Sequence, residues 1–465
     1  MTRSFVDLRI SMQPRQQTNG AIDGDLLRPV LKRPGAGWYI IVAVSGTLFF
    51  GAIGAFGYQV WRGIGVWGIN RPVMWAFDIT SFVFWIGISH AGTLISAILR
   101  VTGAEWRRPV TRCAEAITVF ALMIGAMFPI IHLGRPWLFY WLVPYPNERG
   151  LWPNFRSPLA WDFFAINTYL LGSMIYLFLP LIPDLALIRD RSTGLRKRIY
   201  GALSLGWRGT QLQWARLEKA VQVMAVVIIP VAVSVHTIVS WDFAMTIRPM
   251  WHSTIFGPYF VAGAIFSGIA ALILAMGVIR RAFHLEEYLR PVHFNNLGLL
   301  LLTMSLVWFY FTFSEYLTVW YGNAPGEMPV FHSKISGSYS SMFWAMVVCC
   351  FIIPAPLLAF KRLRTIGGTV IASALIVVGM WIERFLIIVP TLAKPELSFN
   401  WGSYRPTWVE IVLALGTLGY FGLLYALFTK LFPIIAVWEY KEGLPLGEHG
   451  EALVVSSPEA GFENA

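Results

Sequence analysis

Apolar residues occur along this chain in ten long blocks separated by short polar segments. Each block is close to the roughly 20 residues that a helix needs to cross the hydrocarbon core of a bilayer. The blocks lack the alternating pattern of barrel strands, and an isolated segment in lipid satisfies its own backbone only as a helix. The pattern therefore predicts ten spanning helices, at residues 38–60, 74–99, 113–133, 160–186, 219–245, 256–280, 294–320, 340–360, 366–390 and 407–433.

The predicted fold class is an all-α integral membrane protein with a ten-helix domain at 38–433, an N-terminal segment at 1–37 and a C-terminal tail at 434–465. Spans 2 and 6 look alike, and each is followed by a basic turn that contains Arg-Pro-Val, at Arg108 and at Arg290. Spans 2–5 and 6–9 are therefore expected to form two four-helix bundles. Because each copy has an even number of helices, the repeat would be parallel. The first and tenth spans would flank the two bundles.

The positive charge of the chain is placed asymmetrically. Its formal net charge is +11, but the basic residues lie in short loops and form no continuous stripe for nucleic acid. With the N-terminus inside, 26 of the 36 Lys and Arg residues lie on the inner side. This bias predicts a multi-pass protein of the bacterial inner membrane with both termini in the cytoplasm. The segment 1–37 has no apolar core, so no cleaved signal peptide is expected.

The three cysteines, Cys113, Cys349 and Cys350, form neither a CxxC nor a CxxCH motif. They indicate small apolar helix residues rather than ligands of an iron–sulfur cluster or an attached haem, and we expect no metal site.

Ionisable side chains inside predicted spans are the main evidence for function, because they are costly in lipid and usually serve ligand, ion or proton traffic. Four lie near the outer ends of spans 2 to 5: Asp78, His132, Asp162 and Asp242. Arg135 follows His132 closely. Alone, each could be an interfacial side chain. Together, a histidine that titrates near neutrality and two carboxylates would make a proton-accepting pocket.

Other ionisable residues lie deeper or in other spans. Counted at about 1.5 Å per residue, His90 lies roughly 24 Å below the outer end of span 2 and His236 roughly 13 Å below that of span 5. Because a b-type haem between two helices needs two histidines at one depth, we expect none here. Buried hydrogen-bonded groups and a candidate proton path are both open interpretations for the remaining set, which is His90, Glu115, His236, Glu315 and Glu383.

Several long strings of residues resemble the NrfD/PsrC-like family of quinol-interacting membrane subunits, and most closely those of bacterial alternative complex III. The similarity extends over nearly the whole chain. The strings are NRPVMW, HAGTLISAILR, FPIIHLGRPW, YPNERGLWPNFRSPLAWD and SWDFAMTIRPMWHSTIFGPYF.

The resemblance implies a ten-helix subunit without haem or an iron–sulfur cluster of its own, which oxidises menaquinol or ubiquinol near the periplasmic face. Its implied partners are a periplasmic iron–sulfur subunit, multihaem c-type cytochromes, a paralogous ten-helix subunit, the quinone and lipids. The matching quinol-site positions are His132, Asp162 and Asp242, with Arg135 and Asp78 beside them. Gly268 stands where the repeat would place His90, so an equivalent second quinol site is not expected.

Three alternatives differ in class. A secondary transporter shares repeats and intramembrane charges, but no predicted span is plainly broken near its middle by Gly and Pro. A paralogous structural subunit would share the fold without binding quinol. A membrane anchor of a related NrfD/PsrC-type reductase would share the site, and its redox partner would fix the direction of turnover. Which quinone is used, and whether protons are translocated, the sequence leaves open.

Overall fold

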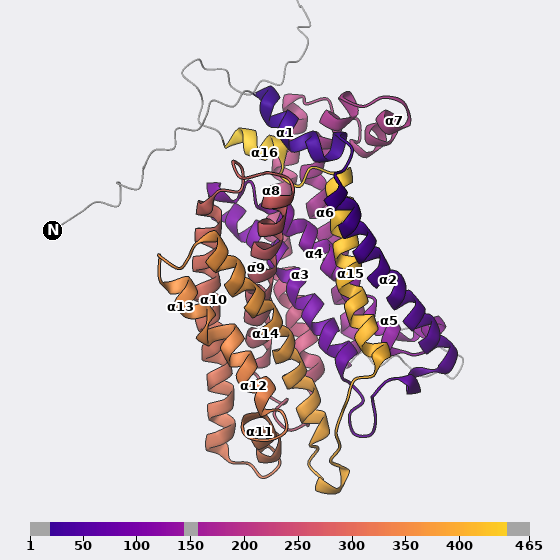
Figure 1. Cartoon of the computed structure of the whole chain (residues 1–465), viewed down its shortest axis with the longest axis vertical. Helices are drawn as coiled ribbons and strands as arrows, with labels where there is room; N and C mark the ends of the chain where they lie inside the picture. The colour runs from indigo at the N-terminus through magenta and orange to yellow at the C-terminus, as the bar shows by residue number, and fades with distance from the viewer. Residues whose placement is uncertain (1–18, 144–156, 444–465) are drawn as a thin grey trace, which may run out of the picture.

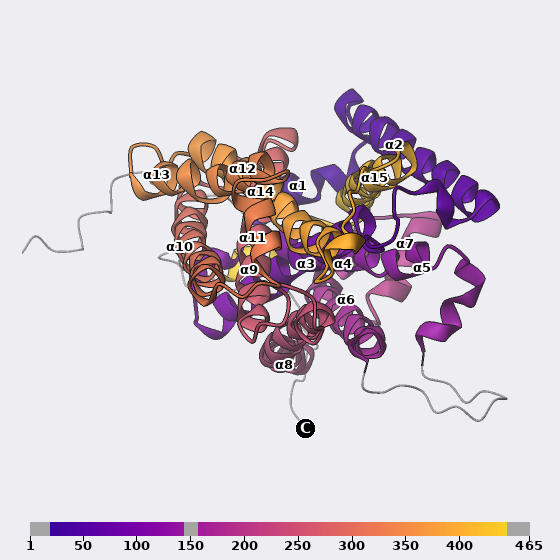
Figure 2. The same ribbon diagram turned by 90° about the horizontal axis from the view of Figure 1, so that it is seen from below.

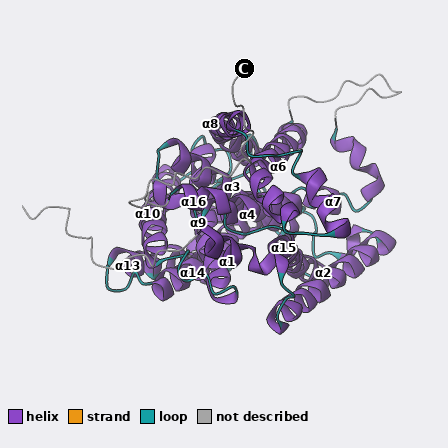
Figure 3. Ribbon diagram, turned by 90° about the horizontal axis from the view of Figure 1, so that it is seen from above, coloured by secondary structure: helices purple, strands orange, loops and turns teal. Residues whose placement is uncertain are grey.

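The computed structural model describes residues 19–143 and 157–443, and within these ranges it contains helices and no strands (Figures 1 and 3). Ten helical segments are long and apolar enough to span a membrane, which confirms the ten predicted spans. They are α2 (Ala36–Arg62), α3 (Phe77–Val101), α4 with α5 (Thr111–Gly125 and Phe128–His132), α6 (Pro158–Asp190), α8 (Gln211–Ala244), α9 (Phe256–Ala282), α10 (Pro291–Gly322), α12 with α13 (Ser340–Val347 and Pro354–Ala359), α14 (Ile366–Ala393) and α15 (Trp408–Leu431).

Shorter elements connect the spans. They are α1 (Asn19–Leu31), η1 (Ile64–Val66), η2 (Glu105–Arg107), η3 (Pro136–Leu142), α7 (Gly194–Leu203), α11 (Met328–Ile335), η4 (Val348–Ile352), η5 (Ser398–Asn400) and α16 (Val437–Glu442). The string that precedes span 4 in the sequence, residues 144–156, lies outside the described residues.

Local sequence signals set the helix ends. Pro158 and Pro291 begin α6 and α10, where a missing backbone N–H leaves no hydrogen bond unmade. Thr210 and Thr407 cap α8 and α15 and form capping boxes with Gln213 and Glu410. The span boundaries lie within a few residues of their predicted positions, except that α8 begins eight residues before the predicted start of span 5.

Two spans are interrupted. Span 3 breaks after Gly125 because Pro129 cannot donate a hydrogen bond to that residue and its ring would clash there, so α5 continues at a new angle. Span 8 contains the π-helical turn η4 just before Pro354. The interruption of span 3 matters for the site because His132 is the last residue of α5.

The spans pack against one another in a continuous bundle. Helix α3 contacts α4 and α8, and α6 contacts the same two helices, while α9 and α14 contact each other and α10. Helix α3 also contacts α9 and α14, and α2 packs with α15 at one side (Figure 2). The division into two four-helix bundles and their descent from one repeat stay predictions.

Helices α3 and α4 approach so closely that side chains interrupt the backbone hydrogen bonding of α3. A Cβ atom added at Gly92 would lie 1.6 Å from the carbonyl oxygen of Ala114. The Thr118 hydroxyl donates to the Ser89 carbonyl at 2.7 Å and accepts from the Thr93 N–H at 2.9 Å. A hydroxyl inserted in this way loosens a helix locally, and it does so next to His90.

The bundle has two opposite ends. We call the end that holds α1, α7 and α16 the basic end, and the opposite end, with α5, η3 and α11, the aromatic end (Figure 1).

At the basic end, parts of the N-terminal segment and of the C-terminal tail are docked on the spans. Helix α1 buries Ile22, Leu26 and Leu27, and Glu439 of α16 pairs with Arg100 and, at 3.2 Å, with Arg107. These segments fold onto the bundle because buried ion pairs and apolar side chains, which single-residue hydropathy does not reveal, hold them there.

Candidate functional site

The first element of the site is a histidine–carboxylate pair at the aromatic end. Asp78, in the first turn of α3, hydrogen-bonds through Oδ2 to Nδ1 of His132. The His132 side chain is 26% exposed, whereas that of Asp78 is 4% exposed. Because Asp78 engages one ring nitrogen, the other nitrogen, Nε2, is left to face a ligand.

Neighbouring groups hold this pair in place. The buried Gln59 side chain donates to the Ile131 carbonyl at 2.7 Å and accepts from the Trp67 indole at 3.1 Å. The Trp67 ring lies 6.1 Å from the His132 ring. Glu410 accepts the Gly68 N–H at 2.8 Å and thereby fixes the loop that carries Trp67. The position of His132 is thus determined by α2, α3 and α15 as well as by its own helix.

The second element is a pair of acidic side chains. Asp162 lies near the start of α6 and Asp242 in the last turn of α8, and their carboxyl groups are within hydrogen-bond reach of each other. Both are buried, at 6% and 7% exposed. The adjacent Trp161 and Trp241 pack edge to face at 5.9 Å, so aromatic rings accompany the acids on both helices.

Each of the three aspartates has one carboxyl oxygen that is buried and has no hydrogen-bond partner among the described residues. Such groups are rare in folded proteins, since an unpaired buried acceptor costs about 1–3 kcal/mol, and they call for a specific explanation. The aromatic end therefore offers open acceptor positions from Asp78, Asp162 and Asp242.

The four residues expected to converge are brought together as two pairs, Asp78 with His132 and Asp162 with Asp242. No hydrogen bond among the described residues joins one pair to the other. Arg135 does not take part in either pair: it is exposed just before η3 and forms no side-chain hydrogen bond or ion pair within the described part of the chain.

The expectation that His90 and His236 lie at different depths was wrong. Their ring centroids are 4.6 Å apart, and both residues are fully buried. Counting residues from the helix ends assumed parallel axes and level ends, but α3 slopes across the bundle and differs in length from α8 (Figure 1). Both His90 nitrogens face carbonyl oxygens, of Ile86 and Ala232, each at 2.7 Å, so this ring is not oriented as a haem ligand.

Glu115 belongs to a separate polar cluster nearer the basic end. Its carboxylate accepts from Ser96 at 2.6 Å, and Ser96 also contacts the Tyr176 hydroxyl at 3.3 Å. Ser89, His90, Thr93 and Ser96 are all buried along α3, so polar side chains line its interior from His90 to this cluster.

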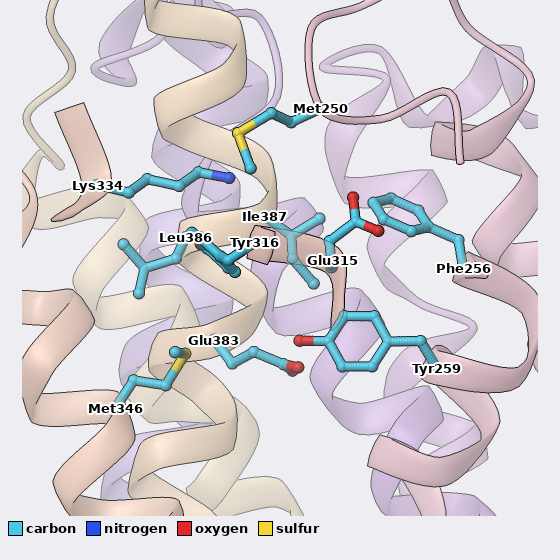
Figure 4. A pocket seen from close by; sticks show the side chains of 10 residues that line it. All are labelled: Met250, Phe256, Tyr259, Glu315, Tyr316, Lys334, Met346, Glu383, Leu386 and Ile387. Carbon is cyan, nitrogen blue, oxygen red and sulfur yellow. The ribbon is translucent and has the colours of Figure 1, made fainter. Parts of the chain in front are cut away.

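Glu315 of α10 and Glu383 of α14 line a small cavity with Tyr259 and Lys334 (Figure 4). The cavity has room for about a water molecule. Glu383 forms a buried ion pair with Arg384 at 3.0 Å and accepts from the Trp308 indole at 2.9 Å. Glu315 accepts from Ser253 at 3.1 Å.

Lys334 is a buried charge that the sequence did not indicate, because it lies in α11 between spans 7 and 8. Its side chain points into the same cavity (Figure 4). Burial lowers the pKa of Lys334 from 10.5 to about 8, and the nearby negative charge of Glu315 partly offsets this effect.

Sequence reasoning also missed several buried acidic and amide side chains that stabilise the fold or support the site. Asp184 pairs with Arg112 at 2.5 Å near the basic end, and Gln59 and Glu410 support His132 as described above. Glu410 carried a usable signal, because Thr407 and Glu410 have the spacing of a capping box. Gln59 carried none. Within the described ranges, no group of three or more His, Cys, Asp or Glu side chains is arranged to hold a metal ion.

Comparisons with known proteins agree on one family. The family model described as "Polysulphide reductase, NrfD" matches residues 65–396. A protein of Halobacterium salinarum, provisionally named as a membrane subunit of dimethyl sulfoxide reductase, is 25% identical over 88% of this chain and 94% of its own length. A selenate reductase subunit of Mesobacillus selenatarsenatis is 23% identical over 77% and 86%. The Hdr-like menaquinol oxidoreductase integral membrane subunit of Archaeoglobus fulgidus is 25% identical over 83% and 91%.

Proposed function

This chain belongs to the polysulphide reductase NrfD family, and on that basis we propose that it is the quinol-reactive membrane subunit of an oxidoreductase complex. The printed names of its relatives describe subunits of two reductases and of a menaquinol oxidoreductase. These names favour the anchor of an NrfD/PsrC-type reductase over a subunit of alternative complex III.

One observation carries the proposal: the buried and unpaired carboxyl oxygens of Asp78, Asp162 and Asp242 at one end of the bundle. A quinol head group has two hydroxyl groups, and each must find an acceptor before it can lose its proton. The two side-chain pairs supply acceptors of two kinds, an imidazole and a carboxyl pair.

Quinol oxidation releases two protons and two electrons and leaves a quinone. We assign one proton to Nε2 of His132, while Asp78 stabilises the resulting positive charge through Nδ1. The second hydroxyl donates to the Asp162–Asp242 pair, which titrates as a unit. The two electrons pass to a redox centre of a partner subunit, for which an iron–sulfur protein is the proposed class.

The partner set tests this assignment. The tagged chain is purified from its native membrane and the associated subunits are identified. A reductase catalytic subunit with an iron–sulfur protein is expected. Multihaem cytochromes with a paralogous ten-helix subunit would instead place the chain in alternative complex III. Isolation without any redox protein would contradict both assignments and favour a transporter.

A further inference from the structure

A groove at the basic end lies between α1, α7 and the last turn of α15. It has a volume of about 560 Å³, within the range of small-molecule sites. Its lining residues are Val30, Leu195, Arg196, Ile199, Tyr200, Leu203, Lys430, Leu431 and Phe432. Seven of these nine are apolar or aromatic, and none is acidic, so the groove combines a mostly apolar wall with two cations.

Helix α7 has the pattern of a helix that lies in the plane of a membrane surface. Leu195, Ile199 and Leu203 recur every four residues and share one face, while Arg196, Lys197 and Arg198 occupy the turn between them. Leu195 and Ile199 are 72% and 49% exposed. An amphipathic helix with basic residues beside an exposed apolar face is typical of contact with anionic lipids.

The two cations of the groove are held by neutral partners, so their charge is not neutralised there. Arg196 donates from Nη2 to the Val30 carbonyl at 2.8 Å, and the Lys430 ammonium donates to the Pro29 carbonyl at 2.9 Å. Neither residue forms an ion pair within the described part of the chain. By contrast, Asp23 of α1 is already paired with Arg191 and Lys441.

We propose that this groove binds an anionic phospholipid of the leaflet at the basic end, with its phosphate at Arg196 and Lys430 and an acyl chain along Leu195, Ile199 and Leu203. The groove begins where the apolar span of α15 ends, at Leu431, which is the level of the boundary between acyl chains and head groups. Basic pockets at this level are a recognised form of head-group site.

Native mass spectrometry of the full-length protein in its complex tests the proposal, with phosphatidylglycerol and phosphatidylcholine of identical acyl chains as probes. Combining Arg196→Gln with Lys430→Gln should weaken phosphatidylglycerol binding by about thirtyfold, since each basic group near the surface contributes about fivefold. Phosphatidylcholine binding should change little. The matched control combines Lys361→Gln with Arg362→Gln, which removes the same charge from an exposed loop and should change phosphatidylglycerol binding less than about twofold.

Two further experiments distinguish head-group binding from a general loss of fold and from occupation of the groove by a protein segment. The charge-conserving pair Arg196→Lys with Lys430→Arg should keep phosphatidylglycerol binding within about threefold of the parent. Equal loss in the groove and control variants, or loss in the charge-conserving pair, would overturn the proposal. A photoreactive residue at Ile199 should crosslink to lipid in native membranes. Crosslinking to a peptide, from this chain or from a partner subunit, would show a protein occupant and would equally overturn it.

Discussion

Buried carboxyl groups in this chain fall into two kinds, and their hydrogen bonds distinguish them. Asp184 is surrounded by donors: the Arg112 guanidinium at 2.5 Å, the Val437 N–H at 3.0 Å and the Trp438 N–H at 3.4 Å. Asp162 and Asp242 have each other and an oxygen with no partner. The first kind stabilises the fold, whereas the second has acceptor capacity to spare for a ligand.

His132 gives the sharpest test at the residue scale. Replacing His132 with Leu removes the proton acceptor and keeps an apolar side chain at the end of α5, so assembly should survive. General-base assistance is worth about 10² to 10⁴ in rate, so quinol oxidation by the purified complex should fall at least about a hundredfold. Asp162→Asn and Asp242→Asn should cause similar losses.

A second histidine at the aromatic end provides the matched control. His252 is half exposed and pairs with Glu327 at 3.3 Å, and no hydrogen bond or ion pair among the described residues joins it to the four site residues. His252→Leu should leave quinol oxidation near the parental rate. Electron transfer among the partner's centres, started with a chemical reductant, should be unchanged in all these variants. If the His132→Leu complex assembles and oxidises quinol at the parental rate, His132 is only an interfacial residue.

Because Lys334 is buried, the free energy of unfolding of the protein should depend on pH. Its pKa is lowered to about 8 in the folded chain, against 10.5 for the exposed side chain. Between these values the unfolded chain binds more protons, so the free energy of unfolding rises with pH across this window. Lys334→Met removes the effect: at pH 7 the variant should be more stable by at most about 3 kcal/mol, and the difference should shrink as the pH rises and vanish only above the unfolded pKa of 10.5.

Thermal unfolding in detergent across pH 7 to 10 measures this difference. Lys361→Met, at an exposed position, should show no pH-dependent difference from the parent. A constant offset between Lys334→Met and the parent would mean that Lys334 stays charged in the folded protein.

At the scale of elements, the docking of α16 depends on a buried ion pair. Asp184 in α6 holds Arg112 of α4 and the backbone of Val437, so it joins three elements at the basic end. Asp184→Ala leaves Arg112 as an unpaired buried charge, which should cost about 3–5 kcal/mol. The thermal midpoint and the yield of assembled protein should fall.

The double variant Arg112→Met with Asp184→Leu removes both charges and is the informative comparison. It should recover much of the lost stability, because well-packed apolar residues often replace a buried ion pair at little cost. A double variant as unstable as Asp184→Ala would show that the backbone hydrogen bond to Val437, rather than the charge pair, secures α16.

Helix positions could be predicted from the sequence because length, hydropathy and caps are local properties, and all ten spans were found, with only the start of span 5 more than a few residues from its predicted position. Contacts between helices could not. The adjacency of His90 and His236 depends on the slope of α3, which follows from its close packing on α4 at Gly92 and from the inserted hydroxyl of Thr118. No single-chain pattern encodes such a crossing angle.

The candidate site was predictable in part for the same reason. His132, Asp162 and Asp242 stand out because charge is rare in apolar blocks. Their division into two pairs depends on contacts of α3 with α5 and of α6 with α8, and the support of His132 by Gln59 and Glu410 comes from α2 and α15. All of these contacts join residues distant in sequence. Lys334 was missed because a lysine in a connecting segment is ordinarily exposed, and only the fold shows that it is buried.

For the molecule as a whole, the orientation in the membrane decides which compartment the proposed quinol site faces. The basic end carries α1, α7 and α16 and most of the Lys and Arg residues, whereas the four site residues lie at the aromatic end. The positive-inside rule therefore predicts that the basic end is cytoplasmic and that protons from quinol are released toward the periplasm.

Two reporters test this orientation. Green fluorescent protein fused after Ala465 should fluoresce, because it matures in the cytoplasm, and alkaline phosphatase inserted after Leu397 should be active, because it matures in the periplasm. Leu397 suits the insertion since it is 56% exposed in the connection between α14 and α15 at the aromatic end. Each reporter exchanged to the other position should be silent, which controls for expression. The reverse pattern would show that the basic end faces the periplasm. The proposed quinol site would then face the cytoplasm, and protons from quinol would be released into the cytoplasm.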